Sequence, residues 1–306
     1  MNKRKIGVLV MSYGTPESMD AIEAYYTHIR RGKPPTKEAL AELTAKYESI
    51  VGGVFPLRQH TNEQVQALER CLRQHTDAYD MACYQGLKHA PPFIEDGIGQ
   101  MAQDGIRQGI GIVLAPHYSA MSVGEYIKRA KQKADELEIA FTFVESYHLH
   151  PKLIEALCLR VQQALPKFAG EDVMVLFSAH SLPRKILEMN DPYVDQLLAT
   201  SKAVADKTGI DRWKFVWQSA GQTAVPWLGP DITEELKQLH AEGIRNVLVC
   251  PVGFVSDHLE VLYDIDIECQ RLAKELGMHL ERTESLNADP LFIEALADVI
   301  MHALEG

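Results

Sequence analysis

Two residues in the second half of the chain have the side-chain types to move protons or to hold a metal ion. His180 lies in FSAHSLP (177–183), after the apolar run of residues 173–176, and Glu260 lies in DHLEVLYDIDIE (257–268), after another apolar run. An imidazole and a carboxylate together can accept protons near neutral pH and can bind a borderline divalent metal ion. A lone histidine at a strand end is more often structural, so the neighbouring carboxylate is what favours chemistry.

A row of carboxylates continues from this pair. Glu260, Asp264 and Glu268 recur at spacing four, which places them on one face of a helix. A solvated helix face is the plainer interpretation, and the alternative is a relay for protons or a divalent cation that begins beside His180. The HExxH, GxSxG, GxGxxG and P-loop patterns are absent from the sequence, which argues against zinc-protease, serine-hydrolase, dinucleotide and ATP sites.

Composition narrows the class of protein. The chain has 306 residues and a formal net charge of -11, without a basic tail, so we expect no nucleic-acid partner. Its five cysteines form no CxxC pair, which fits a reducing cytoplasm and argues against a zinc knuckle. No apolar run approaches the ~20 residues of a membrane span. We therefore expect a cytoplasmic globular protein without a transmembrane segment.

Apolar runs alternate with amphipathic segments, and the alternation occurs twice. Predicted strands cover residues 6–11, 81–85, 110–115 and 141–145, and then 173–178, 214–218, 246–252 and 279–284. ESYHLHPKLIEAL (145–157) closely matches ESLNADPLFIEAL (284–296), and three further pairs of segments match in the same order. Near-continuous apolar strands separated by helices indicate parallel sheets covered on both faces. The sequence therefore predicts an α/β protein with two similar Rossmann-like domains, each a four-stranded parallel sheet flanked by helices.

The boundary between the domains is predicted near residue 150. Residues 1–150 form the first domain, with an insertion between about residues 17 and 80, and residues 151–306 form the second, whose last helix (about 290–305) can pack back across the boundary. Ligands of such sheets bind beyond the carboxyl ends of the strands. We therefore expect a cleft lined by Tyr13, His180 and Glu260 and bordered by the insertion. Basic residues in the insertion favour a substrate that carries carboxylates or phosphates.

Seven segments together resemble the ferrochelatase family. They are FSAHSLP, WQSAGQTAVPWLGPD (217–231) and PVGFVSDHLEVLYDIDIE (251–268) in the second half, and MSYGTP (11–16), YYTHIRRGKPP (25–35), YQGLKHAPPFIED (84–96) and LAPHYSAMSV (114–123) in the first. The resemblance covers nearly the whole chain and is strongest to the short enzymes of Gram-positive bacteria that insert ferrous iron into coproporphyrin III. It implies the chelatase fold and a lyase of haem biosynthesis.

The resemblance also implies roles for individual residues. The family's catalytic histidine and its glutamate partner fall on His180 and Glu260, which would meet Fe²⁺, and Tyr13 falls on a tyrosine that can ligate the iron of the product. Asp264 and Glu268 fall where family members can hold an outer, hydrated Mg²⁺. Residues implied to cradle the macrocycle or its propionates are Arg30, Arg31, Lys46, Tyr47, Ser122, Tyr126 and Trp227.

Two positions depart from the family pattern. Phe55 stands where a serine often contacts a propionate, and Lys46 stands where close relatives have arginine, which makes a carboxylate fork that lysine cannot make. The chain ends at Gly306 without a Cys-rich extension, so we expect no [2Fe–2S] cluster, and no organic cofactor is implied.

Several alternatives stay open at this point. The substrate could be protoporphyrin IX; the protein could be a cobalt or nickel chelatase of a sirohydrochlorin-type ring, or a non-catalytic haem carrier. Expected partners are the porphyrin, ferrous iron, and an iron donor or a downstream enzyme of the haem pathway, and we expect a monomer. The sequence leaves open the face by which iron enters, and whether His180 acts as a base or as a metal ligand.

Overall fold

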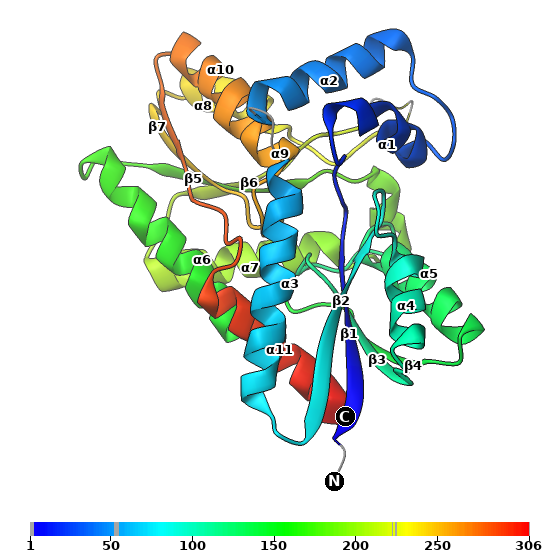
Figure 1. The fold of residues 1–306 in the computed structure, drawn as a ribbon. Helices are drawn as coiled ribbons and strands as arrows, with labels where there is room; N and C mark the ends of the chain where they lie inside the picture. Colours follow the sequence, from blue (N-terminus) through cyan, green and yellow to red (C-terminus); the bar gives the residue numbers. More distant parts are fainter. Residues whose placement is uncertain (1–2, 52–54, 222, 224, 306) are drawn as a thin grey trace. The chain divides into compact units, whose positions relative to one another are not determined.

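The computed structural model describes residues 3–51, 55–221, 223 and 225–305, and its internal contacts divide the chain into two compact units (Figure 1). Unit 1 contains Met1–Pro116, Ser122–Tyr147 and Asn287–Gly306. Unit 2 contains His117–Met121 and His148–Leu286. The C-terminal segment is therefore grouped with the N-terminal sheet rather than with the half of the chain that precedes it.

Unit 1 is built on a four-stranded sheet of β1 (Arg4–Ser12), β2 (Tyr79–Leu87), β3 (Gln108–Val113) and β4 (Ala140–Val144). The strand order is β2-β1-β3-β4, and every pairing is parallel. From Ile6 onward every residue of β1 is buried, as expected for a central strand covered on both faces. The two loops that follow β1 and β2 therefore leave the sheet at the same edge.

Helices cover this sheet and include the predicted insertion. Between β1 and β2 come the short turn η1 (Met19–Ala21) and the helices α1 (Ile22–Ile29), α2 (Lys37–Val51) and α3 (Pro56–His75). The others are α4 (Ile94–Gln103), α5 (Val123–Glu136) and α11 (Pro290–Glu305). Helix α11 packs against α3, β3 and β4, and in Figure 1 it lies beside α3. Its buried face is almost entirely aliphatic and aromatic.

Unit 2 repeats the same sheet. Its strands are β5 (Met174–His180), β6 (Trp213–Gln218), β7 (Asn246–Cys250) and β8 (His279–Arg282), in the parallel order β6-β5-β7-β8. Its helical elements are α6 (Pro151–Ala164), η2 (Leu165–Phe168), η3 (Arg184–Met189), α7 (Tyr193–Thr208), α8 (Ile232–Ala241), α9 (Leu259–Leu262), the π-helical segment η4 (Asp264–Cys269) and α10 (Gln270–Glu275). In both sheets the first strand of the half lies between the second and third.

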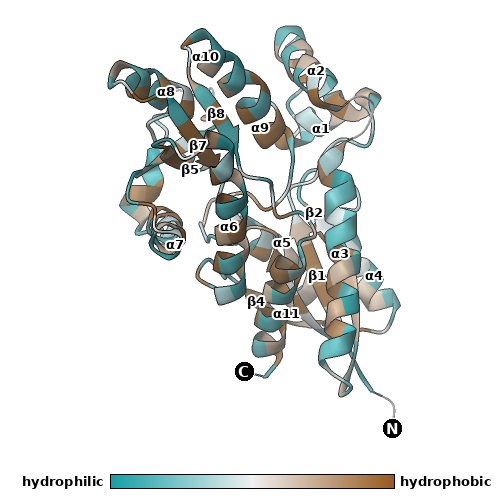
Figure 2. Cartoon of the chain, turned by 90° about the vertical axis from the view of Figure 1, so that its left-hand side faces the viewer, coloured by the Kyte–Doolittle hydropathy of each residue, from teal (hydrophilic) through white to brown (hydrophobic). Residues whose placement is uncertain are grey.

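Apolar side chains hold these layers together. In unit 2, Leu176, Val247 and Val249 of the sheet pack against Leu236 and Ile265 from the helices, and all five are fully buried. Burial of each such side chain contributes about 1.5–3 kcal/mol. Figure 2 shows the same division, with brown strands β5 and β7 and helices that carry teal residues on part of their surface.

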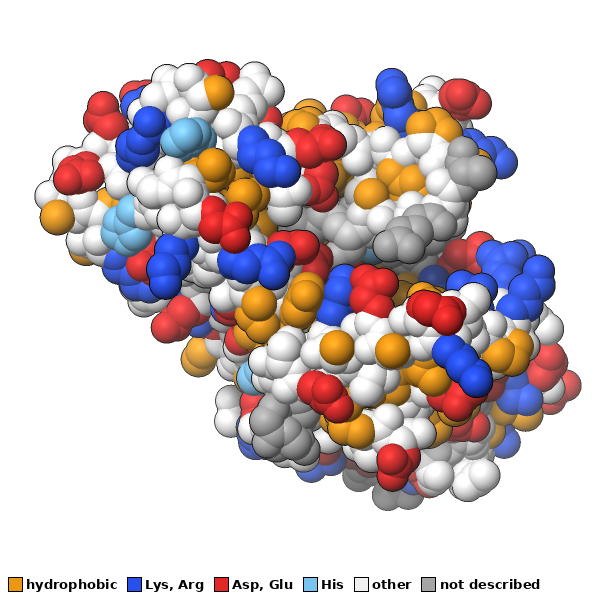
Figure 3. Space-filling model, turned by 90° about the horizontal axis from the view of Figure 1, so that it is seen from above, with side chains coloured by type: hydrophobic (Ala, Val, Ile, Leu, Met, Phe, Trp, Pro, Cys, Tyr) orange, Lys and Arg blue, Asp and Glu red, His pale blue; other side chains and the backbone are white. Residues whose placement is uncertain are grey.

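The predicted fold class is confirmed: all eight strands are present, in two four-stranded parallel sheets flanked by helices. The helix expected to carry Glu260, Asp264 and Glu268 is not a regular α-helix, because α9 ends at Leu262 and a π-helical segment follows. Within the described part of the chain, no helix is both long and apolar enough to cross a membrane. On the face shown in Figure 3, basic and acidic side chains are interspersed.

Candidate active site

His180 is the last residue of β5, and its side chain is partly exposed because the strand ends there. The preceding six residues of the strand are buried, and the chain then leaves the sheet where Ser181 N donates to Gln218 O at 2.8 Å. The Tyr193 hydroxyl donates to the carbonyl of His180 at 3.1 Å. The backbone is thus fixed on both sides, while the imidazole itself stays 35% exposed.

Glu260 meets His180 from the loop and helix that follow β7. Its carboxylate Oε2 lies 2.9 Å from Nδ1 of His180, and its carbonyl accepts a hydrogen bond from Gln218 Nε2 at 2.8 Å. Strands β6 and β7 flank β5 in the sheet, so their carboxyl ends bring these groups to the same edge as His180. The structure therefore brings together the two residues singled out in the sequence.

Electrostatics favour an imidazolium–carboxylate pair. Burial alone would lower the pKa of His180, but the charge of Glu260, the hydrogen bond to it and the charge of Asp264 together raise this pKa above its ordinary 6.5. Burial would raise the pKa of Glu260, but the charge and hydrogen bond of His180 lower it below 4.5, helped by His258 and Ser219. The pair therefore extends the protonated form of His180 to higher pH than for an isolated imidazole.

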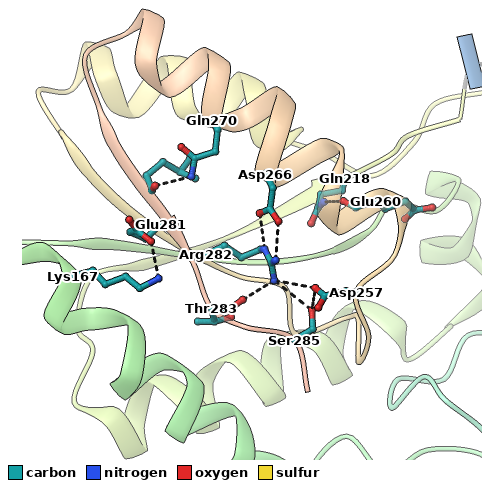
Figure 4. A network of polar contacts seen from close by, with 11 residues as sticks. Lys167, Gln218, Asp257, Glu260, Asp266, Gln270, Glu281, Arg282, Thr283 and Ser285 are labelled. Atoms are coloured by element: carbon teal, nitrogen blue, oxygen red, sulfur yellow. Dashed lines mark hydrogen bonds and ion pairs between the residues drawn. The ribbon is translucent and has the colours of Figure 1, made fainter. Parts of the chain in front are cut away.

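The acidic row continues through a π turn. The Glu268 N–H donates to Tyr263 O at 2.9 Å, five residues back, which is the π-helical pattern. Asp264 accepts a hydrogen bond from Ser219 Oγ and is partly buried, as is Glu268. Asp266 lies off the row, because both of its carboxylate oxygens accept from Arg282, each at 2.8 Å (Figure 4).

The ring of Trp227 lies beside His180. Its ring lies edge-on to His180, with centroids 6.3 Å apart and an interplanar angle of 88°. The indole N–H donates to Thr223 Oγ1 at 2.8 Å, and the ring covers Gly221, where a Cβ would lie 2.3 Å from it. The glycine in this loop is thus needed for the tryptophan to reach the edge of the sheet beside His180.

In unit 1, Tyr13 follows β1 and is 44% exposed. Its ring lies 4.6 Å from that of His89, and its carbonyl accepts from the backbone N–H of His89 at 3.0 Å. Nδ1 of His89 in turn lies 3.0 Å from Nδ1 of His28 on α1. Burial, followed by the charges of Lys88, His28 and Arg129, lowers the pKa of His89 to about 3, so this imidazole is neutral at physiological pH.

Basic groups gather near this part of unit 1. Lys88 Nζ lies 4.9 Å from the centre of the Tyr126 ring, and Arg129 makes a fork to Glu95 at 2.8 and 2.7 Å. Burial, together with Arg129 and Arg31, lowers the pKa of Lys88, although Glu125 opposes the shift. Because the ammonium group of Lys88 is partly removed from water, contact with an anionic ligand would stabilise it more than it would a fully hydrated ammonium group.

The remaining predicted contacts differ in exposure. Arg30 and Arg31 follow α1 as exposed residues, and Arg31 adopts a left-handed backbone with φ 56°. Ser122 is half-buried and precedes α5, while Tyr126 on α5 is 5% exposed. Lys46 on α2 lies 3.6 Å from Glu42.

Tyr47 is placed inside unit 1 rather than on its surface. It is 4% exposed, packs against Phe55 with centroids 5.2 Å apart, and its hydroxyl lies 3.4 Å from Thr15 Oγ1. Phe55 is also buried, at 6% exposure. The departure from serine at position 55 therefore places an aromatic ring in the packing of this unit.

Four polar residues were not selected from the sequence: His28 and His89, which lie near Tyr13 in unit 1, and Ser219 and His258, which lie near Glu260 and Asp264 in unit 2. His28 and His89 lie in the segments 25–35 and 84–96, Ser219 lies in the segment 217–231, and His258 lies two residues before Glu260. Nδ1 of His258 donates to the carbonyl of Ser256 in its own turn at 2.9 Å, and burial lowers the pKa of His258. A usable signal existed for His89, since it follows β2 at the same edge of the sheet as Tyr13.

Within the described residues, no group of three or more His, Cys, Asp or Glu side chains converges to hold a metal ion. A metal ion at His180 and Glu260 would therefore have two protein ligands from this set. Such a pair suits an ion that is delivered and released, since a resident structural zinc site has four ligands.

Comparisons with known proteins agree with the geometry. Residues 5–304 match the family described as Ferrochelatase. Coproporphyrin III ferrochelatase of Geobacillus sp. (strain WCH70) is 44% identical over 100% of both chains, and that of Bacillus subtilis (strain 168) is 45% identical over 99% of both.

Solved structures show the same fold. The sirohydrochlorin chelatase SirB from Bacillus subtilis subspecies spizizenii, in complex with cobalt, superimposes with a TM-score of 0.61 over 98% of this chain and 96% of the other, at 13% identity. CbiX, described as the terminal enzyme of sirohaem biosynthesis in denitrifying bacteria, gives a TM-score of 0.51 at 11% identity and covers 97% of this chain and 99% of the other. The His180–Glu260 pair at the sheet edge, the family match along nearly the whole chain and the full-length relatives lead to one conclusion: this chain belongs to the ferrochelatase family.

Proposed function

We propose that this enzyme inserts ferrous iron into coproporphyrin III, with His180 and Glu260 acting on the pyrrole nitrogens or on the incoming metal ion. The observation that carries the proposal is the 2.9 Å contact between His180 Nδ1 and Glu260 Oε2 at the carboxyl edge of a parallel sheet. The substrate class comes from the full-length relatives, which are named coproporphyrin III ferrochelatases.

The reaction exchanges two protons for one metal ion. A free-base porphyrin loses both pyrrole N–H protons as Fe²⁺ binds the four nitrogens, so a nearby acceptor is needed. The hydrogen bond between the pair engages Nδ1 of His180, which leaves the chemistry of the ring to Nε2. As a base, His180 would take a pyrrole proton at Nε2 and Glu260 would stabilise the imidazolium that forms.

In the alternative role the same two residues act as metal ligands. If iron arrives along the acidic row, neutral His180 and Glu260 would hold it briefly and release it to the macrocycle. If iron does not arrive along the acidic row, the pair would act as the proton acceptor, and Tyr13 is the residue to which we assign ligation of the product iron. Both routes require His180 to be unprotonated at the moment of reaction.

Basic residues of unit 1 supply the contacts that we assign to the propionates. Arg30, Arg31 and Lys46 are the charged candidates, and Ser122 and Tyr126 add hydroxyl groups. Tyr47 supports this region from inside, because it packs on Phe55. In unit 2, Trp227 forms a wall beside His180.

We assign the outer acidic residues Asp264 and Glu268 to proton release or to a hydrated Mg²⁺. Their carboxylates are oxygen ligands, which Mg²⁺ prefers, and they follow Glu260 along the chain. We place the reaction in the cytoplasm of the cell and assign it to a monomer; all five cysteines are free thiols, as a reducing compartment would keep them.

One assay separates this function from its rivals. Coproporphyrin III, protoporphyrin IX and a sirohydrochlorin-type ring are each mixed anaerobically with Fe(II) or Co(II) and a substoichiometric amount of protein, and the Soret band is followed. The proposal predicts multiple turnovers over minutes with coproporphyrin III and Fe(II). A change that stops at one equivalent per protein would indicate a carrier, and preferred turnover of the sirohydrochlorin-type ring with Co(II) would indicate the other chelatase class.

A further inference from the structure

Arg282 is the centre of a polar network that the reaction so far leaves without a role. It is the last residue of β8, and its side chain is only 14% exposed. Its Nε and Nη2 donate to the two carboxylate oxygens of Asp266, both at 2.8 Å, and Nη1 donates to Thr283 O at 2.9 Å (Figure 4). Nη1 also lies 3.4 Å from Asp257 Oδ1 and 3.4 Å from Ser285 Oγ.

Of the two carboxylates that Arg282 binds, one precedes the acidic row in the chain and the other lies between two of its members. Asp257 stands in the turn that precedes Glu260, and Ser285 Oγ donates to it at 2.8 Å. Asp266 stands inside the π-helical segment, between Asp264 and Glu268. One guanidinium therefore ties together the turn that starts α9 and the π turn that follows it.

The π turn is the feature that needs such support. Tyr263 O accepts from both Ile267 N at 3.2 Å and Glu268 N at 2.9 Å, so the α-helical and π-helical hydrogen bonds share one carbonyl. The π-helix is rare and occurs mostly as single turns inside α-helices. A change from the π to the α pattern would rotate Asp264 and Glu268 relative to Glu260, because the number of residues per turn differs. Asp266 belongs to this turn, so holding its carboxylate holds the register.

We propose that Arg282 is a positioning residue for iron insertion: its fork to Asp266, with its contact to Asp257, keeps the π turn in register and so fixes where Asp264 and Glu268 stand relative to Glu260 and His180. The inference rests on the proposed function of that pair. Among the residues that the structure describes, Arg282 makes no hydrogen bond or ion pair with His180 or Glu260, so it acts through the segments that it joins.

The fork explains why arginine is required at this position. A guanidinium presents donors in a rigid plane and can serve Asp266 with two of them while a third nitrogen faces Asp257. Lysine keeps the positive charge but is a point donor and cannot make both contacts in this geometry. Arg282→Lys therefore removes the fork with less electrostatic disturbance than removal of the charge would cause.

The test compares two variants at opposite ends of the fork with one control. Arg282→Lys and Asp266→Asn each break the paired hydrogen bonds. Glu281→Gln is the control, because Glu281 adjoins Arg282 on β8 but pairs with Lys167, at 2.9 Å, instead. Iron insertion into coproporphyrin III is measured with iron varied at saturating porphyrin and with porphyrin varied at saturating iron, alongside the melting temperature.

We expect both fork variants to lower kcat/KM for Fe(II) by about 10- to 100-fold, as displacement of a catalytic group does. The Kd for coproporphyrin III should change by less than about twofold, which is the usual effect of substituting a residue that does not contact the ligand. The double variant should be little worse than either single variant, because both remove the same interaction. Glu281→Gln should retain wild-type kinetics.

Two results would overturn the inference. One is wild-type iron kinetics in both fork variants. The other is a loss that follows the folded fraction alone and affects iron and porphyrin equally, because that pattern belongs to a structural ion pair. His180→Ala, assayed in parallel, distinguishes a failure of this inference from a failure of the proposed function. If His180→Ala is inactive while the fork variants are normal, only the role of Arg282 is wrong. If His180→Ala is fully active, the proposed site is wrong, and the role of Arg282 is wrong with it.

Discussion

Gly253 offers a quantitative test of how the strand that carries His180 is packed. It follows β7, and its N–H donates to Ser178 O at 3.1 Å, next to the end of β5. A Cβ at this position would lie 2.3 Å from Cβ of Ala179 and 2.8 Å from Cα of Ala179. Because Ala179 is fully buried and directly precedes His180, Gly253→Ala perturbs the backbone that holds the catalytic side chain.

The size of the effect follows from the distances. Ordinary van der Waals contact of a Cβ begins at 3.4 Å, so the loop after β7 and the end of β5 must separate by about 1 Å. Overpacking of this kind destabilises a fold by about 1–3 kcal/mol, and each kcal/mol lowers the Tm of a chain of a few hundred residues by roughly 2–4 °C. A shift of about 1 Å at a catalytic group lowers the rate by about 10²-fold.

The assay measures Tm by calorimetry and initial rates of iron insertion into coproporphyrin III at a temperature where the variant is folded. Gly99→Ala is the matched control: Gly99 lies in α4, a Cβ there meets nothing within 4 Å, and the substitution should stabilise the helix by about 0.5–1 kcal/mol. A Gly253→Ala variant with wild-type Tm and wild-type rate would refute the close packing of this loop on β5.

Four further substitutions test the electrostatics and packing. Glu260→Gln removes the charge that raises the pKa of His180. The acidic limb of the pH–rate profile, where activity rises as His180 loses its proton, should therefore move to lower pH, and the maximal rate should fall. An unmoved limb would show that another group titrates there. Asp264→Asn and Glu268→Gln should change the dependence on Fe(II) or Mg²⁺ more than coproporphyrin affinity, and unchanged metal titrations in both would make the row a solvated face. Phe55→Ser should destabilise the fold by about 3–5 kcal/mol, close to the loss of a buried aromatic ring, and a Tm equal to wild type would contradict its packing.

The pair also predicts how stability depends on pH. The raised pKa of His180 contributes stability that is fully present below its ordinary 6.5 and is lost as pH rises through the folded-state value. The lowered pKa of Glu260 contributes stability that is present above 4.5 and is lost as pH falls through the folded-state value. The stabilisation from this pair is therefore complete between about pH 4.5 and 6.5 and fades on both sides.

Much of the framework can be predicted because it rests on local patterns. The apolar run before His180 is a buried parallel strand, and a polar residue that directly follows such a run stands at the ligand-binding edge. The same reasoning placed Glu260 after β7 and Tyr13 after β1. The internal repeat predicted two similar four-stranded parallel sheets, since duplicated segments fold alike.

The parts that could not be predicted depend on contacts between distant segments. Spacing four suits both an α-helix and a π turn, so the acidic residues alone do not reveal the break after Leu262. The fork between Arg282 and Asp266 joins a strand to a helix, and the contact of His28 with His89 spans 61 positions. Tyr47 reads as a polar aromatic beside basic residues, and only its packing on Phe55 shows that it lies inside.

His180→Ala tests the central claim most directly when three quantities are measured on one preparation: Tm, the Kd for coproporphyrin III and the rate of iron insertion. The imidazole is 35% exposed and supports little packing, so we expect a folded variant that binds porphyrin normally. Its insertion rate should fall by about 10²–10⁴-fold, the typical loss of a general base. His279→Ala, at an exposed position on β8, is the control and should keep the wild-type rate. A His180→Ala protein with a lowered Tm but a normal rate per folded molecule would contradict the account.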